Sequence, residues 1–63
     1  MHNFIKYRVT FKKKTLSVYF DFRFLKPQAE PHVFFLARSA LVANYPSLSC
    51  LTWDRVDLEV YYE

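Results

Sequence analysis

Glycine is absent from this chain of 63 residues, although average usage of about 7% would supply roughly four. Walker loops, dinucleotide-binding fingerprints and nucleophile elbows need glycine where the backbone turns tightly or approaches a ligand. The missing glycines therefore exclude these three motifs in their standard forms. We expect a protein that is not an enzyme, with no cofactor and no small-molecule substrate.

Cysteine is almost absent as well, because Cys50 is the only one. A single cysteine cannot form an internal disulfide, and an unpaired thiol favours a reducing compartment. No run approaches the ~20 apolar residues of a membrane-spanning helix, and the N-terminus lacks the pattern of a secretory signal. We expect a cytoplasmic protein that does not contact membranes, and the role of Cys50 stays open.

Metal-binding patterns are missing too. His2, His32 and Cys50 do not form the paired clusters that are typical of zinc sites. Asp57 and Glu59 share the outward face of a predicted strand, opposite basic residues. That placement favours a solvated charge ladder over acid–base or metal chemistry. The sequence thus predicts no catalytic residue and no metal ligand.

Aromatic residues are abundant, at 21% of the chain. A chain of this length forms one domain, here residues 1–63, and its single core is close to the lower limit of stability. Aromatic side chains bury a large area each. They can replace the missing disulfides, alone or together with self-association.

Three segments alternate between apolar and polar residues, as half-buried strands do: residues 3–11, 16–25 and 55–62. Residues 12–15 between the first two fit a four-residue hairpin loop built on a type I turn, which needs no glycine. The residues expected to face inward are Ile5, Tyr7, Val9 and Phe11; Leu16, Val18, Phe20, Phe22 and Phe24; and Val56, Leu58, Val60 and Tyr62.

Residues 31–44 follow a helical period. Pro31 suits the first turn, Glu30 is a candidate N-cap, and Asn44 is expected to end the helix in a left-handed conformation. Residues 45–53 have no clean period but contain large apolar residues, so we expect them to fold back over an edge of the core. The arc expected to face the sheet comprises Val33, Leu36, Ala37, Ala40 and Leu41.

The order of elements is ββαβ, which predicts an α+β fold. A three-stranded antiparallel sheet of order 2-1-3, with the helix packed on one face, satisfies the connection rules. Opposite charges support this order, because Lys6 and Arg8 then lie between Asp21 on one side and Asp57 and Glu59 on the other. Each such pair contributes only ~0.2–1 kcal/mol, enough to choose a register.

The net charge of +3 is unevenly distributed, with +6 over residues 1–26 and −3 over residues 27–63. Basic residues between aromatics can bind nucleic acid through phosphate contacts and base stacking. Lysines at an exposed turn also act as an ordinary protection against aggregation. The candidate nucleic-acid-binding residues are Lys12, Lys13, Lys14 and Arg8.

Two other surfaces are candidates for binding a protein, the outward sheet face and the back of the helix. Tyrosine and arginine are common at the energetic centres of protein interfaces. Each surface can equally be a solvated face with no partner. The candidate protein-binding residues are Tyr19, Arg23 and Tyr61 on the sheet, and Phe35, Arg38 and Val42 on the helix.

We therefore expect a non-enzymatic binding module that occupies a surface of a protein partner, as an inhibitor or adaptor. Compact chains without motifs are often encoded by phages or mobile elements and act on a host protein, so a host–virus interaction fits this expectation. Self-association into a homodimer is compatible with it. The alternative is a nucleic-acid-binding protein that uses the basic hairpin.

Overall fold

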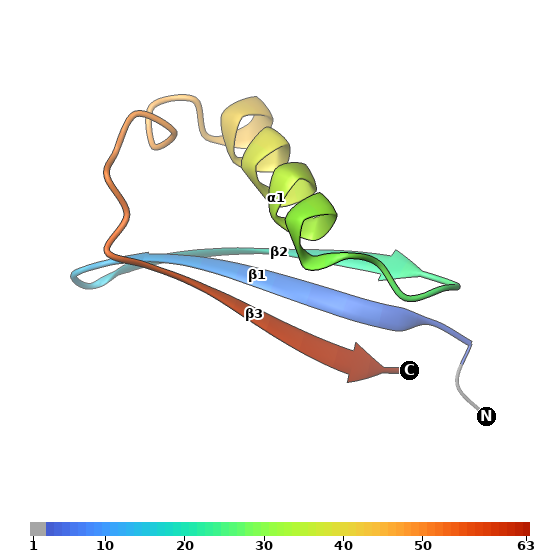
Figure 1. Ribbon diagram of the computed structural model, residues 1–63. Coiled ribbons are helices and arrows are strands. Elements are labelled where there is room, and N and C mark those ends of the chain that lie inside the picture. Colours follow the sequence, from blue (N-terminus) through green and yellow to red (C-terminus); the bar gives the residue numbers. More distant parts are fainter. Residues whose placement is uncertain (1–2) are drawn as a thin grey trace.

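The computed structural model describes residues 3–63 and shows one helix lying across a three-stranded sheet (Figure 1). The predicted ββαβ order and α+β class are confirmed. The elements are β1 (Ile5–Lys13), β2 (Leu16–Phe24), α1 (Glu30–Asn44) and β3 (Arg55–Tyr62).

The sheet has the order β2-β1-β3, and both neighbouring pairs are antiparallel, as predicted. At its centre Val9 pairs with Phe20 on one side and with Leu58 on the other. Residues that pair directly across antiparallel strands share a face of the sheet. The three alternating segments therefore direct their apolar residues to the same face, the inner face, where α1 lies.

The hairpin between β1 and β2 is tighter than predicted. The expected four-residue loop is wrong, because β1 continues to Lys13, which pairs with Leu16. Only Lys14 and Thr15 form the turn, and Lys14 has a φ of 54°. Two-residue hairpin turns need positive φ to match the strand twist, and without glycine Lys14 adopts it. Its N–H donates to Oδ2 of Asp54 at 3.1 Å, which helps to hold this conformation.

Both predicted helix caps are wrong. The helix begins at Glu30, and the N-cap is Ala29, which makes no side-chain cap hydrogen bond. Glu30 instead places its charge in the first turn, where the helix dipole favours an acid. Asn44 is the last helical residue and does not have positive φ. Its side-chain amide bonds back within the helix and donates to the Ala40 carbonyl at 2.8 Å.

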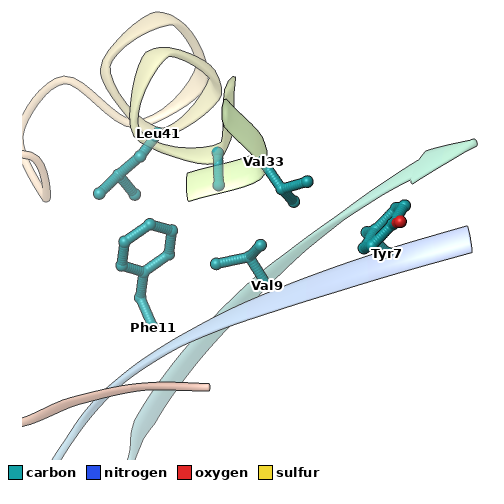
Figure 2. Packing of buried hydrophobic residues seen from close by; sticks show 6 residues of the cluster. Tyr7, Val9, Phe11, Val33 and Leu41 are labelled. Atoms are coloured by element: carbon teal, nitrogen blue, oxygen red, sulfur yellow. The ribbon is translucent and has the colours of Figure 1, made fainter. Parts of the chain in front are cut away.

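The core forms where α1 meets β1 (Figure 2). Half-buried phenyl rings of β2 and the helix residue Phe34 surround it. Tyr7 keeps its hydroxyl satisfied by accepting a hydrogen bond from the Gln28 N–H at 2.9 Å. The buried apolar residues are Tyr7, Val9 and Phe11 of β1, and Val33, Ala37 and Leu41 of α1.

The segment after the helix folds back over one end of the core, as predicted. Leu48 and Trp53 pack against the buried cluster, and the rings of Trp53 and Phe11 are 5.6 Å apart. Over residues 3–63, no helix has the length and apolar content needed to cross a membrane.

The helix covers only part of the inner face. It packs on β1 and β2 and makes no close backbone contact with β3 in the described chain (Figure 1). An α-helix is about 10 Å across and neighbouring strands are about 4.8 Å apart, so one helix spans roughly two strands. The expectation that α1 covers the apolar face therefore holds for two strands and fails for the third.

Candidate protein-binding surfaces

The outer face of the sheet, opposite α1, is centred on Arg8. Its guanidinium donates two hydrogen bonds to the Asp21 carboxylate, from Nε at 2.7 Å and from Nη2 at 3.0 Å. These bonds lower the pKa of Asp21 below its usual 3.8 and raise the pKa of Arg8. The rings of Tyr19 and Tyr61 lie 4.4 and 5.8 Å from the guanidinium carbon. Arg8 is thus held between two rings and a carboxylate.

Glu63 links the two edges of this outer face. Its carboxylate accepts a hydrogen bond from Arg23 Nε at 2.9 Å and lies 3.2 Å from Lys6 Nζ. The bond from Arg23, followed by that from Lys6, lowers the pKa of Glu63. The acid at the end of β3 therefore neutralises cations on both β1 and β2.

The same pairing continues along β3. Asp57 accepts a hydrogen bond from Arg55 Nε at 2.8 Å and lies 3.4 Å from Lys12 Nζ, and its pKa is lowered mainly by Arg55. The Tyr61 hydroxyl donates to Glu59 at 2.7 Å, which raises the pKa of Tyr61. The outer face is thus a set of internally paired charges. The predicted pairing of Arg8 with Asp21 is confirmed. The partners of Asp57 and Glu59 differ from the prediction, because these acids bond to Arg55, Lys12 and Tyr61 in place of Lys6 and Arg8.

The structure brings Tyr19, Arg23 and Tyr61 together on this outer face. Arg23 already donates a hydrogen bond to Glu63, and Tyr61 already donates one to Glu59. A partner that used these groups would have to compete with bonds already made. These three predicted residues therefore lie on one surface, and most of their polar groups already have hydrogen-bond partners within the chain.

The basic hairpin is also partly neutralised. Lys12 pairs with Asp57, and Lys13 Nζ donates to the Thr52 carbonyl at 2.9 Å. Arg8 lies away from the tip and is bonded to Asp21. Of the four candidate residues, only Lys14 has no side-chain partner among the contacts of residues 3–63 described above. These pairings reduce the charge that the hairpin offers to a phosphate backbone.

The back of the helix, formed by Phe35, Arg38 and Val42, is exposed. Phe35 is 66% exposed and Val42 51% exposed, and Arg38 is exposed with them. The helix lies on the inner face of the sheet, so this surface and the outer face are on opposite sides of the molecule (Figure 1). The six predicted protein-binding residues therefore form two separate surfaces.

A third surface was missed by the sequence reasoning. We call the inward residues of β3, Val56, Leu58, Val60 and Tyr62, the β3 strip. Leu58 packs against the core, but Val56 is 41% exposed, Val60 43% and Tyr62 63%. A single predicted helix for three predicted strands was the signal, because one helix is too narrow to cover all three.

A hollow of about 520 Å³ lies at the opposite edge of the sheet. It opens between the start of β2 and the segment that follows α1. Its lining is mostly apolar, and comprises Leu16, Ser17, Val18, Tyr19, Tyr45 and Leu48.

No cluster in the described part of the chain resembles a metal site, since no three histidine, cysteine or acidic side chains gather there. The His32 ring lies 6.5 Å from Phe24, and Cys50 is exposed. His2 lies outside the described residues. No family model, no curated protein and no solved structure matches the chain.

Proposed function

We propose that the protein is a non-enzymatic binding module that covers a protein partner, as an inhibitor or an adaptor, with the β3 strip and the back of the helix. One observation carries this proposal. The inward residues Tyr7, Val9 and Phe11 of β1 are buried, whereas Val56 and Val60 beside them on the same face are more than two-fifths exposed. An apolar sheet face that its own helix leaves open is suited to a partner.

The proposal places one partner across both surfaces, past the flank of α1 that carries Phe34. His32 contacts Phe24, which places its flank of the helix on the side of β2. Phe34 lies two residues further, about 200° around the helix, and so faces the side of β3. Phe34 packs against the core. A partner that covers the β3 strip and reaches past Phe34 would also contact the exposed Phe35 and Val42.

The β3 strip and the back of the helix suit the same kind of partner. The surface is apolar, with Arg38 as the cation beside it, whereas a nucleic-acid site needs basic side chains along its length. Partner residues that bury apolar side chains against the β3 strip and place an acid near Arg38 would match it. The exposed free thiol of Cys50 supports a reducing compartment such as the cytoplasm as the place of action.

The test is affinity capture with the immobilised protein from an extract of the cells that make it, with and without nuclease. Val60→Lys places a charge in the β3 strip, at an exposed edge-strand site where lysine is tolerated. Tyr19→Ala is the matched control on the outer face. We expect a nuclease-resistant protein partner that Tyr19→Ala retains and Val60→Lys loses, by about 10-fold or more in Kd if a central contact is removed.

Two results would contradict the proposal. Loss of the partner with Tyr19→Ala but not with Val60→Lys would assign binding to the outer face. Release of all bound material by nuclease, together with loss of binding when Lys12, Lys13 and Lys14 are neutralised, would establish the nucleic-acid alternative.

A further inference from the structure

We propose that the open edge of β2 is an interface for a second copy of this chain. Two β2 strands pair antiparallel with Phe20 of one copy opposite Phe20 of the other. The two sheets then become one continuous sheet of six strands. This inference rests on the edge of β2 and is independent of the proposed function, which uses the other edge.

The backbone of β2 is arranged for such pairing. Phe4 and Glu63 exchange both backbone hydrogen bonds, at 2.9 and 2.8 Å. Because bonding alternates along antiparallel strands, even-numbered residues of β1 bond to β3 and odd-numbered ones bond to β2. The odd-numbered residues of β2 therefore direct their N–H and C=O groups to the open edge. These residues are Ser17, Tyr19, Asp21 and Arg23.

Overlap of the two strands favours this register, and charge does not oppose it. With Phe20 at the centre, Leu16–Phe24 overlaps its copy over its whole length, and about eight backbone hydrogen bonds can form. Tyr19 then faces Asp21 of the second copy, and Ser17 faces Arg23. No like charges oppose each other within the strand.

The edge of β3 differs, because pairing about its middle brings like charges together. Its charged residues include Asp57 and Glu59, which are both outward and two positions apart. Antiparallel pairing of two β3 strands about Asp57, Leu58 or Glu59 sets an acid of one copy opposite an acid of the other. Like charges directly opposite are destabilising. A second copy therefore fits β2 and not β3.

The hollow at the start of β2 fits the same register. Leu16 and Val18 line it together with Tyr45 and Leu48, which stand on the inner face. In the paired sheet, Phe24 of the second copy lies opposite Leu16, and its Phe22 lies opposite Val18. Both are inward residues, so they lie on the same face as the apolar side chains that line the hollow.

The helices are compatible with the dimer. Antiparallel edge pairing places both copies of α1 on the same face of the joined sheet. A helix above β1 and β2 then lies about two strand spacings from its copy, or about 10 Å, which is the distance of packed helices. The flank that includes His32 meets its counterpart there, and it continues with Leu36, Ser39 and Ala43, two of which are small.

The dimer leaves each β3 at an outer end of the six-stranded sheet. Two partner-binding surfaces would then be presented by one assembly, and neither is covered by self-association. Sedimentation measures the dimer and capture measures the partner, so failure of one proposal is distinguishable from failure of the other.

The first test is sedimentation equilibrium of the wild-type chain over a concentration series. Ser17→Pro removes an N–H that faces the open edge of β2, a position where edge strands accept proline. Val60→Pro is the matched control at the β3 edge. We expect a monomer–dimer equilibrium that Ser17→Pro weakens by about 10-fold or more and Val60→Pro leaves unchanged, since two intermolecular bonds are lost only at β2.

The second test fixes the register and does not depend on a proline variant folding. In a Cys50→Ser background, Ser17→Cys protein is mixed with Arg23→Cys protein under mild oxidation. We expect disulfide-linked dimers in the mixture and not in either protein alone. In this register, Ser17 of one copy and Ser17 of the other lie six positions apart along the strands, and so do the two copies of Arg23. That separation is about 20 Å, whereas a disulfide joins Cα atoms no more than ~7 Å apart.

Several outcomes would overturn the proposal. A wild-type chain that is monomeric up to its solubility limit excludes the dimer. A dimer that Val60→Pro disrupts and Ser17→Pro does not is formed through β3. Efficient crosslinking of Ser17→Cys protein with itself contradicts the register centred on Phe20.

Discussion

The inner face of this small sheet has two unlike halves. In β1, Val9 is fully buried beneath α1. In β3, Val60 belongs to the same face and has the same alternating pattern around it, yet 43% of it is exposed. Both strands carry apolar residues inward, but β1 is the central strand beneath α1, whereas β3 is an edge strand that makes no close backbone contact with α1 in the described chain.

This contrast shows what alternation can and cannot specify. A period of two residues assigns each side chain to a face, but it says nothing about what lies above that face. Cover depends on the number and width of the elements packed there. With one helix for three strands, part of the apolar face along β3 remains exposed.

The largest expected effect is the loss of stability when a large side chain is truncated in the covered half of the inner face. Phe11 is buried and contacts the rings of Phe20 and Trp53. We expect Phe11→Ala to cost about 3–5 kcal/mol, because it leaves a cavity in the core. A domain of this length has only roughly 3–9 kcal/mol in total. The variant should therefore be largely unfolded or melt far below wild type in a urea titration.

Val56 is the control for this experiment, since it pairs with Phe11 across β1 and β3. Val56→Ala should cost less than about 1 kcal/mol, because the side chain is already partly in water. Equal losses for Phe11→Ala and Val56→Ala would mean that the two halves are equally covered, and the contrast would fail.

A smaller effect is expected from a change of polarity at constant shape. Val9→Thr buries a hydroxyl beneath α1 and should cost about 1–3 kcal/mol. Val60→Thr leaves its hydroxyl in water, so the free energy of unfolding should change by less than about 0.5 kcal/mol. Thermal melts of the two variants measure this difference. A Val60→Thr variant as unstable as Val9→Thr would show that the β3 strip is buried.

The smallest expected effect on stability concerns the outer face, where paired charges and not burial beneath a helix contribute to stability. The hydrogen bonds from Arg8 hold the pKa of Asp21 below 3.8. The stabilisation that follows from this lowered pKa is fully present above the pKa that Asp21 has in the unfolded chain. It is lost as the pH falls through the lower pKa that Asp21 has in the folded protein. We expect the melting temperature to be level between about pH 5 and 8 and to fall below pH 3.8.

Asp21→Asn isolates this contribution. At neutral pH the variant should melt below wild type, and the gap should narrow as the pH falls below 3.8. The remaining acid dependence would come from Asp57 and Glu63, whose pKa values are also lowered by cations. A gap that stays constant down to strongly acidic pH would show that Arg8 and Asp21 do not stabilise the fold through charge.

Much of the fold could be predicted from the sequence, because three alternating segments and one helical segment leave few arrangements. The turn could not, since nothing local marks Lys14 as the residue that adopts positive φ. The helix caps were missed for a similar reason. Ala29 has no side chain that signals a cap, and Asn44, the last helical residue, bonds to Ala40 and does not adopt the left-handed conformation.

The candidate site was predicted in part. Parity alone placed Tyr19, Arg23 and Tyr61 on one face, and the structure agrees. Their pairing could not be predicted, because Glu63 reaches Arg23 on a strand that is not its neighbour. Such contacts depend on sheet twist and on the reach of long side chains, which the order of residues does not specify.

The most direct measurement of the central claim is the reactivity of a thiol in each half of the inner face. In a Cys50→Ser background, Val60→Cys and Val9→Cys are labelled with a thiol reagent in dilute, native protein. The account predicts that Val60→Cys reacts almost as fast as an unfolded thiol, that Val9→Cys reacts only through unfolding, and that a captured partner slows Val60→Cys alone. Equal protection of the two thiols in the free protein would contradict it.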